Sequence, residues 1–194
     1  MKRIVDYAQL FMKEYLKDGD IAVDFTMGNG FDTLFLAKLT PHGKVYAFDV
    51  LEEALENTKA KLSQDGIKNV ELILDGHEHA DRYISRFKAG IFNFGYLPRS
   101  NKEVTTLLNT SQEAVEKALK LLERKGILIL VLYPGHEQGT LESRYFSSYI
   151  QSLDTYYYEC FTFKMENKTD CPYIIGIEKK REKQGDFVLF MGKL

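Results

Sequence analysis

Two glycines spaced one residue apart follow a short apolar segment near the start of the chain. Residues 24–30 read DFTMGNG, and the overlapping run 21–25 is apolar enough to predict a buried strand. Gly28 and Gly30 permit backbone conformations, and a close approach of a ligand, that a side chain would block. The segment therefore predicts a ligand-binding loop between a strand and the N-terminus of a helix. The alternative is a tight strand-to-helix turn with no ligand.

Acidic residues stand at the ends of the next two predicted strands. Asp49 closes the run 44–49, about 20 residues beyond the glycines, where a carboxylate can bind both hydroxyls of a ribose. Asp75 follows the run 70–74. Because the carboxyl ends of parallel strands share one edge of a sheet, we expect both acids beside the glycine loop.

The loop lacks the third glycine of the dinucleotide-binding pattern, since position 33 is Thr33. This difference favours S-adenosylmethionine over NAD. A pyrophosphate needs the helix N-terminus, whereas carboxylates and backbone groups serve the charged methionine end of the methyl donor. Asp24 and Asp32 are the candidate carboxylates. Alternatively, Asp32 is a first-turn acid that complements the helix dipole.

Residues 93–98 read NFGYLP and follow the fourth predicted strand, at the same edge of the sheet. Asn93 offers a carbonyl that can accept a hydrogen bond from an amine, and the ring of Tyr96 can stack on a base. The segment resembles the Asn/Asp-Pro-Pro-Tyr/Phe signature of amino-group methyltransferases, with both prolines absent. A turn without a chemical role is the alternative.

Residues 133–139 read YPGHEQG and follow the fifth predicted strand. His136 can position an acceptor or take its proton, since an imidazole titrates near neutral pH. A histidine at a helix entry is the alternative, and the residues alone favour it. His77 and His79 could be metal ligands, but no third histidine accompanies them, so no metal site is predicted. Packing beside an adenine, or exposure at the surface, is the preferred interpretation of these two.

Short β-rich runs alternate with longer amphipathic segments, which is typical of an α/β fold with a parallel sheet. Strands are predicted over 21–25, 44–49, 70–74, 90–94, 126–132, 156–165 and 173–178, and helices over 1–18, 30–39, 52–64, 80–86, 101–123 and 142–153. The last two strands have no helix between them and should pair antiparallel. We therefore expect a Rossmann-like class I methyltransferase fold. Its seven-stranded sheet is mostly parallel, has helices on both faces and ends in an antiparallel β-hairpin.

Length and charge narrow the class of protein further. A chain of 194 residues suits one domain, with 180–194 as a C-terminal extension that has no assigned role. The longest apolar run, 126–134, is too short to span a bilayer, and the charged N-terminus predicts no signal peptide, so we expect a cytoplasmic protein. The net charge of −2 excludes a generally basic protein that coats nucleic acid, but it allows a local positive patch that binds RNA.

Three motifs together resemble the rRNA methylase family of Firmicutes. They are DxTMGNGxDT over 24–33, NxGYLP over 93–98 and YxGHxxG over 133–139. Characterised members of that family are tRNA 5-aminomethyl-2-thiouridine methyltransferases that act on the wobble base. The resemblance implies S-adenosylmethionine as donor, S-adenosylhomocysteine as product, a tRNA anticodon stem-loop as partner and a homodimer. The dimer is not indicated by the residues themselves.

The resemblance and the motifs together define the expected site. The donor pocket would comprise Asp24, Thr26, Gly28, Asn29, Gly30, Asp32, Thr33, Asp49, Asp75, His77 and Asn93. The acceptor would contact Tyr96, Arg99, Tyr133 and His136. In this scheme Asn93 orients the amine, Tyr96 stacks on the base and His136 handles a proton. Phe31 and Arg99 depart from the residues expected at their positions.

The expected reaction is methylation of the aminomethyl nitrogen of a wobble uridine, which needs mainly alignment and desolvation. Basic residues that could contact phosphate are Arg99, Lys102, Lys179, Lys180 and Arg181, with a solvated charge run as the alternative. Two other functions stay open: methylation of rRNA or a small amine, and a non-catalytic module that binds S-adenosylmethionine or RNA.

Overall fold

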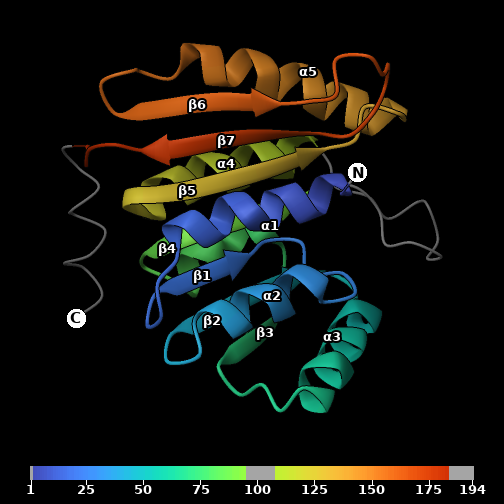
Figure 1. The fold of residues 1–194 in the computed structure, drawn as a ribbon, viewed down its shortest axis with the longest axis vertical. Helices are drawn as coiled ribbons and strands as arrows, with labels where there is room; N and C mark the ends of the chain where they lie inside the picture. Colours follow the sequence, from blue (N-terminus) through green and yellow to red (C-terminus); the bar gives the residue numbers. More distant parts are fainter. Residues whose placement is uncertain (1, 95–107, 184–194) are drawn as a thin grey trace.

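The computed structural model describes residues 2–94 and 108–183, which build one sheet with helices against both faces (Figure 1). In chain order the elements are α1 (Ile4–Tyr15), β1 (Ile21–Asp24), α2 (Phe31–Leu39), β2 (Lys44–Asp49), α3 (Glu52–Gln64), β3 (Val70–Leu74), the 3-10 helix η1 (His77–Arg82), β4 (Phe87–Asn93), α4 (Leu108–Leu121), β5 (Leu122–Leu132), α5 (Glu137–Ser152), β6 (Tyr158–Phe163) and β7 (Tyr173–Lys179).

The seven strands lie in the order β3-β2-β1-β4-β5-β7-β6. Strands β1 to β5 are parallel, whereas β7 runs antiparallel to both β5 and β6. The order reverses direction between β1 and β4, which is the position where open α/β sheets bind ligands. The predicted fold class, with its C-terminal antiparallel hairpin, is confirmed.

Helices α1, α2 and α3 cover one face of the sheet (Figure 1). Ala8 and Met12 of α1 are buried with Ile129 and Val131 of β5, and Leu36 of α2 joins the same cluster. These residues recur at helical spacing on α1 and alternate along β5, so each element turns a continuous apolar face to the other. This packing fixes α1 across the sheet, next to the point between β1 and β4 where the strand order reverses.

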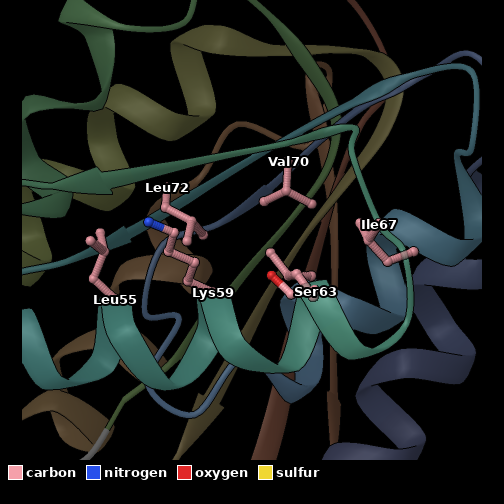
Figure 2. A pocket seen from close by; sticks show the side chains of 7 residues that line it. Leu55, Lys59, Ser63, Ile67, Val70 and Leu72 are labelled. Atoms are coloured by element: carbon pink, nitrogen blue, oxygen red, sulfur yellow. The ribbon is translucent and has the colours of Figure 1, made fainter.

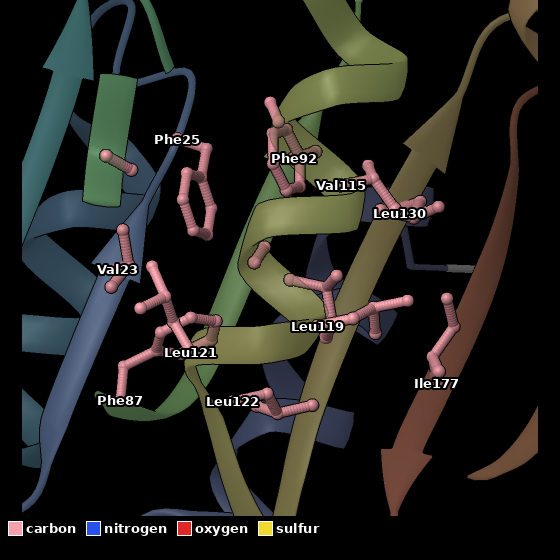
Figure 3. Packing of buried hydrophobic residues seen from close by; sticks show 14 of the residues in the cluster. Val23, Phe25, Phe87, Phe92, Val115, Leu119, Leu121, Leu122, Leu130 and Ile177 are labelled. Carbon is pink, nitrogen blue, oxygen red and sulfur yellow. The ribbon is translucent and has the colours of Figure 1, made fainter. Parts of the chain in front are cut away.

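The other face is covered by η1, α4 and α5. Figure 3 shows Val115 and Leu119 of α4 packed against Leu130 of β5 and the ring of Phe92 of β4. Phe25, directly after β1, stacks on Phe92 with 4.2 Å between the ring centroids. Both layers of the core therefore reach the carboxyl ends of the central strands, where they support the candidate site.

Several predicted boundaries are wrong by a few residues. Strand β5 begins at Leu122, four residues before the predicted start, because the charged residues 123–125 conceal its first segment in the hydropathy pattern. The helix predicted over 101–123 accordingly ends at Leu121, and its residues 101–107 lie outside the described part of the chain. Strand β4 begins at Phe87 instead of 90.

Two helices also differ from expectation. The segment predicted as a helix over 80–86 is a 3-10 helix that begins at His77, so His77 and His79 both lie on it. Helix α5 begins at Glu137, five residues before the predicted start, because His136 caps it. Among the described residues no helix is long and apolar enough to cross a membrane.

Candidate functional site

The loop between β1 and α2 is held against α3. Gly28 and Gly30 have φ angles of 49° and 72°, in the left-handed region that glycine tolerates. A Cβ atom on Gly30 would lie 2.6 Å from Oγ1 of Thr58, whose hydroxyl donates a 3.1 Å hydrogen bond to the carbonyl of Gly28. Asn57 donates to the side chain of Asn29 at 3.2 Å. The glycines thus permit both the turn and its close contact with α3.

The carboxylate of Asp49, at the end of β2, joins the same loop. Its Oδ2 accepts a 2.9 Å hydrogen bond from the backbone N–H of Gly28, and its Oδ1 accepts one of 3.1 Å from Leu51. The acid predicted to bind a ribose therefore also orients the glycine loop. A carboxylate has about four lone-pair positions, so acceptor capacity remains for two hydroxyls.

Asp24 lies beneath the loop and is only 1% exposed. Its carboxylate accepts hydrogen bonds from the hydroxyl of Thr33 at 2.6 Å and from the backbone N–H of Thr26 at 3.1 Å. Burial, followed by the nearby charge of Asp32, raises the pKa of Asp24 to about 7. Its position gives it a role in the shape of the loop and no direct access to the surface.

Asp32, in the first turn of α2, has amide donors on both of its carboxylate oxygens. Oδ1 accepts a 2.7 Å hydrogen bond from Gln9 of α1, and Oδ2 accepts one of 3.4 Å from Asn93 of β4. The residue is 7% exposed, and burial raises its pKa while the two amides oppose that change. A largely buried carboxylate with neutral donors is suited to a cationic ligand group.

Asn93 connects three parts of the site. Its backbone N–H donates a 2.7 Å hydrogen bond to the hydroxyl of Thr26 in the glycine loop. Its side chain hydrogen-bonds Asp32 and the phenol of Tyr133, which follows β5. Burial raises the pKa of Tyr133 to about 12, so this phenol stays protonated at neutral pH. The strand ends of β1, β4 and β5 therefore converge on one polar cluster.

His77 stands at the edge of this cluster with a defined tautomer. Its Nδ1 lies 3.2 Å from the carbonyl oxygen of Phe25, which can only accept, so Nδ1 carries the hydrogen and Nε2 has the lone pair. Burial lowers the pKa of His77, and its ring meets that of Phe92 edge to face. The residue offers a neutral hydrogen-bond acceptor.

Asp75 accepts hydrogen bonds from residues before, on and after η1. Its carboxylate accepts hydrogen bonds from Nδ1 of His79 at 2.7 Å, from the hydroxyl of Tyr83 at 2.8 Å and from the N–H of Gly76 at 2.8 Å. The hydrogen bond from His79 is the main reason that the pKa of Asp75 is lowered. Any contact with a ligand would add to this existing set of hydrogen bonds.

His136 is the N-cap of α5. Its Nδ1 accepts a 3.1 Å hydrogen bond from the backbone N–H of Gly139, which satisfies a donor at the helix start. The structure therefore places this residue at a helix entry, as its alternative interpretation expects, and a role toward the acceptor stays a prediction. The ring nitrogen used for the cap needs its lone pair, so it cannot also take a proton without breaking the cap.

Three of the predicted contacts with substrate or phosphate lie outside the described residues: Tyr96, Arg99 and Lys102. The basic residues 179–181 are far from the glycine loop, because β7 is antiparallel and its end lies beside the start of β5. Lys179 is fully buried and pairs with Glu182 at 2.9 Å. Its prediction as a phosphate contact is therefore wrong, and the run lies at the edge of the sheet opposite the site.

Two residues of the site gave no signal in the sequence. Gln9 is one glutamine in an amphipathic helix, and Thr58 is one threonine in another. Only their positions in the fold bring them to Asp32 and to the glycine loop. Phe31, noted as a departure, is 65% exposed and points to α3, where the Nζ of Lys61 lies 3.8 Å from the ring centre.

A groove between α3 and β3 does not belong to this site (Figure 2). It has a volume of about 360 Å³ and is lined by Leu55, Lys59, Leu62, Ser63, Ile67, Val70 and Leu72. None of these residues was predicted to bind donor or acceptor. Within residues 2–94 and 108–183, no group of three or more histidine, cysteine or acidic side chains could hold a metal ion.

Comparisons with known proteins identify the family of this chain. Residues 45–178 match the family described as "Putative rRNA methylase". A protein named tRNA (mnm(5)s(2)U34)-methyltransferase, chloroplastic, from Arabidopsis thaliana is 31% identical over 192 residues, covering 92% of this chain and 70% of that protein.

Solved structures give the same result. An rRNA methylase from Streptococcus thermophilus has a TM-score of 0.79 and 38% identity, covering 93% of this chain and 99% of its own. A "putative methyltransferase" from Streptococcus mutans, solved in complex with SAH, has a TM-score of 0.84 and 38% identity, covering 92% and 99%. The family match spans more than half of the chain and includes four of the five parallel strands. The chain therefore belongs to the rRNA methylase family of methyltransferases.

Proposed function

We propose that this chain methylates the exocyclic nitrogen of 5-aminomethyl-2-thiouridine at the tRNA wobble position, with S-adenosylmethionine as donor. Methyl transfer as such follows from membership of the family. The choice of acceptor is supported by the name of the Arabidopsis relative and by the polar cluster around Asn93. The substrate is a tRNA anticodon stem-loop in this proposal.

The residues of the sheet edge fit the donor. Gly28 and Gly30 place no side chain over the β1–β4 reversal, and Asp49 stands where it can accept from ribose hydroxyls. Asp32 supplies a buried negative charge for the α-ammonium group, and His77 borders the pocket with a neutral acceptor. Bound S-adenosylmethionine would supply a methyl group on a sulfonium, which is transferred to a nucleophile.

The orientation of the Asn93 amide carries the proposal for an amine acceptor. A carboxylate can only accept hydrogen bonds, so the NH₂ group of Asn93 faces Asp32 at 3.4 Å. The carbonyl oxygen of the same amide is then directed elsewhere and can accept an N–H from the acceptor. An amine held by this oxygen keeps its lone pair free for attack on the methyl group.

The acceptor amine must also lose its proton before it reacts. Burial of an ammonium group lowers its pKa, because a low-dielectric site penalises the charged form. The half-buried ring of Tyr133, which hydrogen-bonds the Asn93 side chain, supplies such an environment next to Asn93. We assign His136 to the cap of α5 and not to proton transfer, since its Nδ1 is engaged by Gly139.

The substrate is tested with tRNA from a strain that lacks the gene. Purified protein and S-adenosylmethionine are incubated with this tRNA, and the nucleosides are measured by mass spectrometry. We expect 5-aminomethyl-2-thiouridine to decrease and its methylated form to appear in equal amount. Asn93→Ala should lower the rate about 100-fold or more through lost positioning of the amine. Methylation of rRNA fragments, with the wobble uridine unchanged, would instead favour the rRNA alternative and overturn the tRNA assignment.

A further inference from the structure

Gln9 of α1 makes a short contact with a buried charge that no motif of the chain identifies. Its Nε2 donates a 2.7 Å hydrogen bond to Oδ1 of Asp32, 23 residues further along the chain. Its neighbour Ala8 is buried, as is Met12 one turn later, so this part of α1 is fixed on the sheet. Gln9 thus approaches Asp32 from a rigid element and not from a loop.

Asp32 needs such a donor to remain ionised. It is almost fully buried, which penalises its charged form, and its own charge raises the pKa of the neighbouring Asp24. Gln9 donates a hydrogen bond to Oδ1 of Asp32 at 2.7 Å, and Asn93 donates one to Oδ2 at 3.4 Å. The bond from Gln9 is the shorter of the two, and it is also the larger of their effects in lowering the pKa of Asp32.

The other charged or titratable groups around Asp32 do little to replace Gln9. Arg3 of α1 attracts the carboxylate, but its side chain is 80% exposed and pairs with Asp6 at 2.9 Å. Asp6 repels Asp32 and partly cancels that attraction. On the sheet side, neither neighbour offers a positive charge to Asp32, because Asp24 of β1 is itself an acid and the phenol of Tyr133 after β5 stays neutral.

We propose that Gln9 is a positioning residue for donor binding, which keeps the Asp32 carboxylate ionised and directed at the methionine ammonium group of the donor. The inference rests on the donor site assigned under the proposed function. It makes α1 part of the binding site and not only a cover for the sheet. It also places a pH limit on donor binding, since a protonated Asp32 cannot pair with an ammonium group.

The test uses the full-length protein and S-adenosylhomocysteine, measured by calorimetry between pH 5.5 and 8. Gln9→Met keeps the size of the side chain and removes the donor. Gln9→Glu keeps the shape and places a second carboxyl group against Asp32, so that the pair shares a proton. Gln151→Met, at an exposed position of α5, is the matched control.

A raised pKa of Asp32 means that affinity is lost at a higher pH. We expect the midpoint of the acid limb to rise by about one pH unit in Gln9→Met and by more in Gln9→Glu. Near pH 8, Gln9→Met should bind within about threefold of wild type, because Asp32 is ionised again. Gln151→Met should match wild type throughout.

Two results would overturn the inference. A loss of affinity in Gln9→Met that is equal at every pH would mean that Gln9 only supports packing, and unchanged binding would mean that it has no role. Thermal unfolding of each variant shows whether the fold is intact. Absence of binding by wild type would refute the donor site itself. Methylation of another RNA by a wild type that binds normally would refute only the proposed substrate.

Discussion

The backbone N–H of Gly28 donates a 2.9 Å hydrogen bond to the carboxylate of Asp49, which joins the loop after β1 to the end of β2. Two neighbouring strands thereby set one binding edge together. The acid has two tasks in this arrangement, since the same carboxylate orients the loop and faces the proposed ribose position. The consequences of this coupling, and of three related contacts, can be measured.

Replacement of Asp49 by alanine should weaken the binding of S-adenosylhomocysteine by about 10- to 100-fold, because both the acceptor for the loop and that for the ribose are lost. Asp49→Asn should lie between alanine and wild type, since an amide oxygen can still accept from Gly28. Calorimetry measures the effect. Glu56→Ala, at an exposed position of α3, is the control and should bind normally. Binding by Asp49→Ala within twofold of wild type would contradict the assignment.

Gly30→Ala should destabilise the protein by more than backbone strain alone. The new Cβ would meet Thr58 at 2.6 Å in addition to occupying a φ of +72°. Gly66 has a φ of +66° with nothing within 4 Å of its Cβ position, so Gly66→Ala isolates the cost of strain, about 1–2 kcal/mol. We expect Gly30→Ala to cost about 1–3 kcal/mol beyond that in urea unfolding.

The double variant Gly30→Ala with Thr58→Ala tests the contact directly. Removal of the threonine side chain relieves the clash, so the double variant should be more stable than the sum of the two single changes, by about 0.5–3 kcal/mol. Strict additivity would show that the loop moves away from α3 at no cost.

Asp24 should make the stability of the fold depend on pH. Its pKa is raised from an ordinary 3.8 to about 7, so the folded protein binds a proton more tightly than the unfolded chain. This contribution to stability is fully present below about pH 4 and is lost as the pH rises through 7. Asp24→Asn removes the titration and still pairs with Thr33.

The difference in unfolding free energy between Asp24→Asn and wild type should therefore shift in favour of the variant between pH 5 and 7.5. Urea unfolding at several pH values measures it. A difference that is constant across this range would mean that Asp24 is ionised throughout.

Two substitutions can separate the capping role of His136 from a role in proton transfer. His136→Asn keeps a side-chain acceptor at the N-cap of α5, whereas His136→Ala removes it. We expect the alanine variant to lose about 1 kcal/mol of stability and the asparagine variant to stay within about 0.5 kcal/mol of wild type. The asparagine variant should keep most of the methyl transfer rate. If the His136→Asn protein is stable but inactive, His136 would instead be the residue that takes the proton of the acceptor.

Much of the fold could be predicted because its signals are local. Strand β2 and helix α3 have the predicted bounds, since an apolar run and an amphipathic run each report on their own backbone. The start of β5 was missed for the opposite reason. Its residues 123–125 are charged and lie at a register shift between the pairs Phe87–Leu122 and Ala89–Ile127, so the pairing of Leu122 and not hydropathy decides where the strand begins.

The glycine loop, the acid at the end of β2 and the asparagine at the end of β4 were evident in the sequence because each ends an apolar run, and the fold gathers such ends at one edge. Contacts across the sheet could not be found in this way. Gln9 meets Asp32 only because α1 packs across β4 and β5, and Asp75 turns to His79 only because η1 follows it closely.

The sequence by itself determined the class of the protein, since glycines that open a backbone and strands that alternate with helices act over short distances. The tertiary structure decided which charges share a site. The antiparallel direction of β7 carries residues 179–181 to the opposite edge of the sheet, and the packing of α1 brings Gln9 to Asp32. The interaction energy of two charges depends on their separation in space. Strand order and strand direction set that separation, and the spacing of the residues along the chain does not show it.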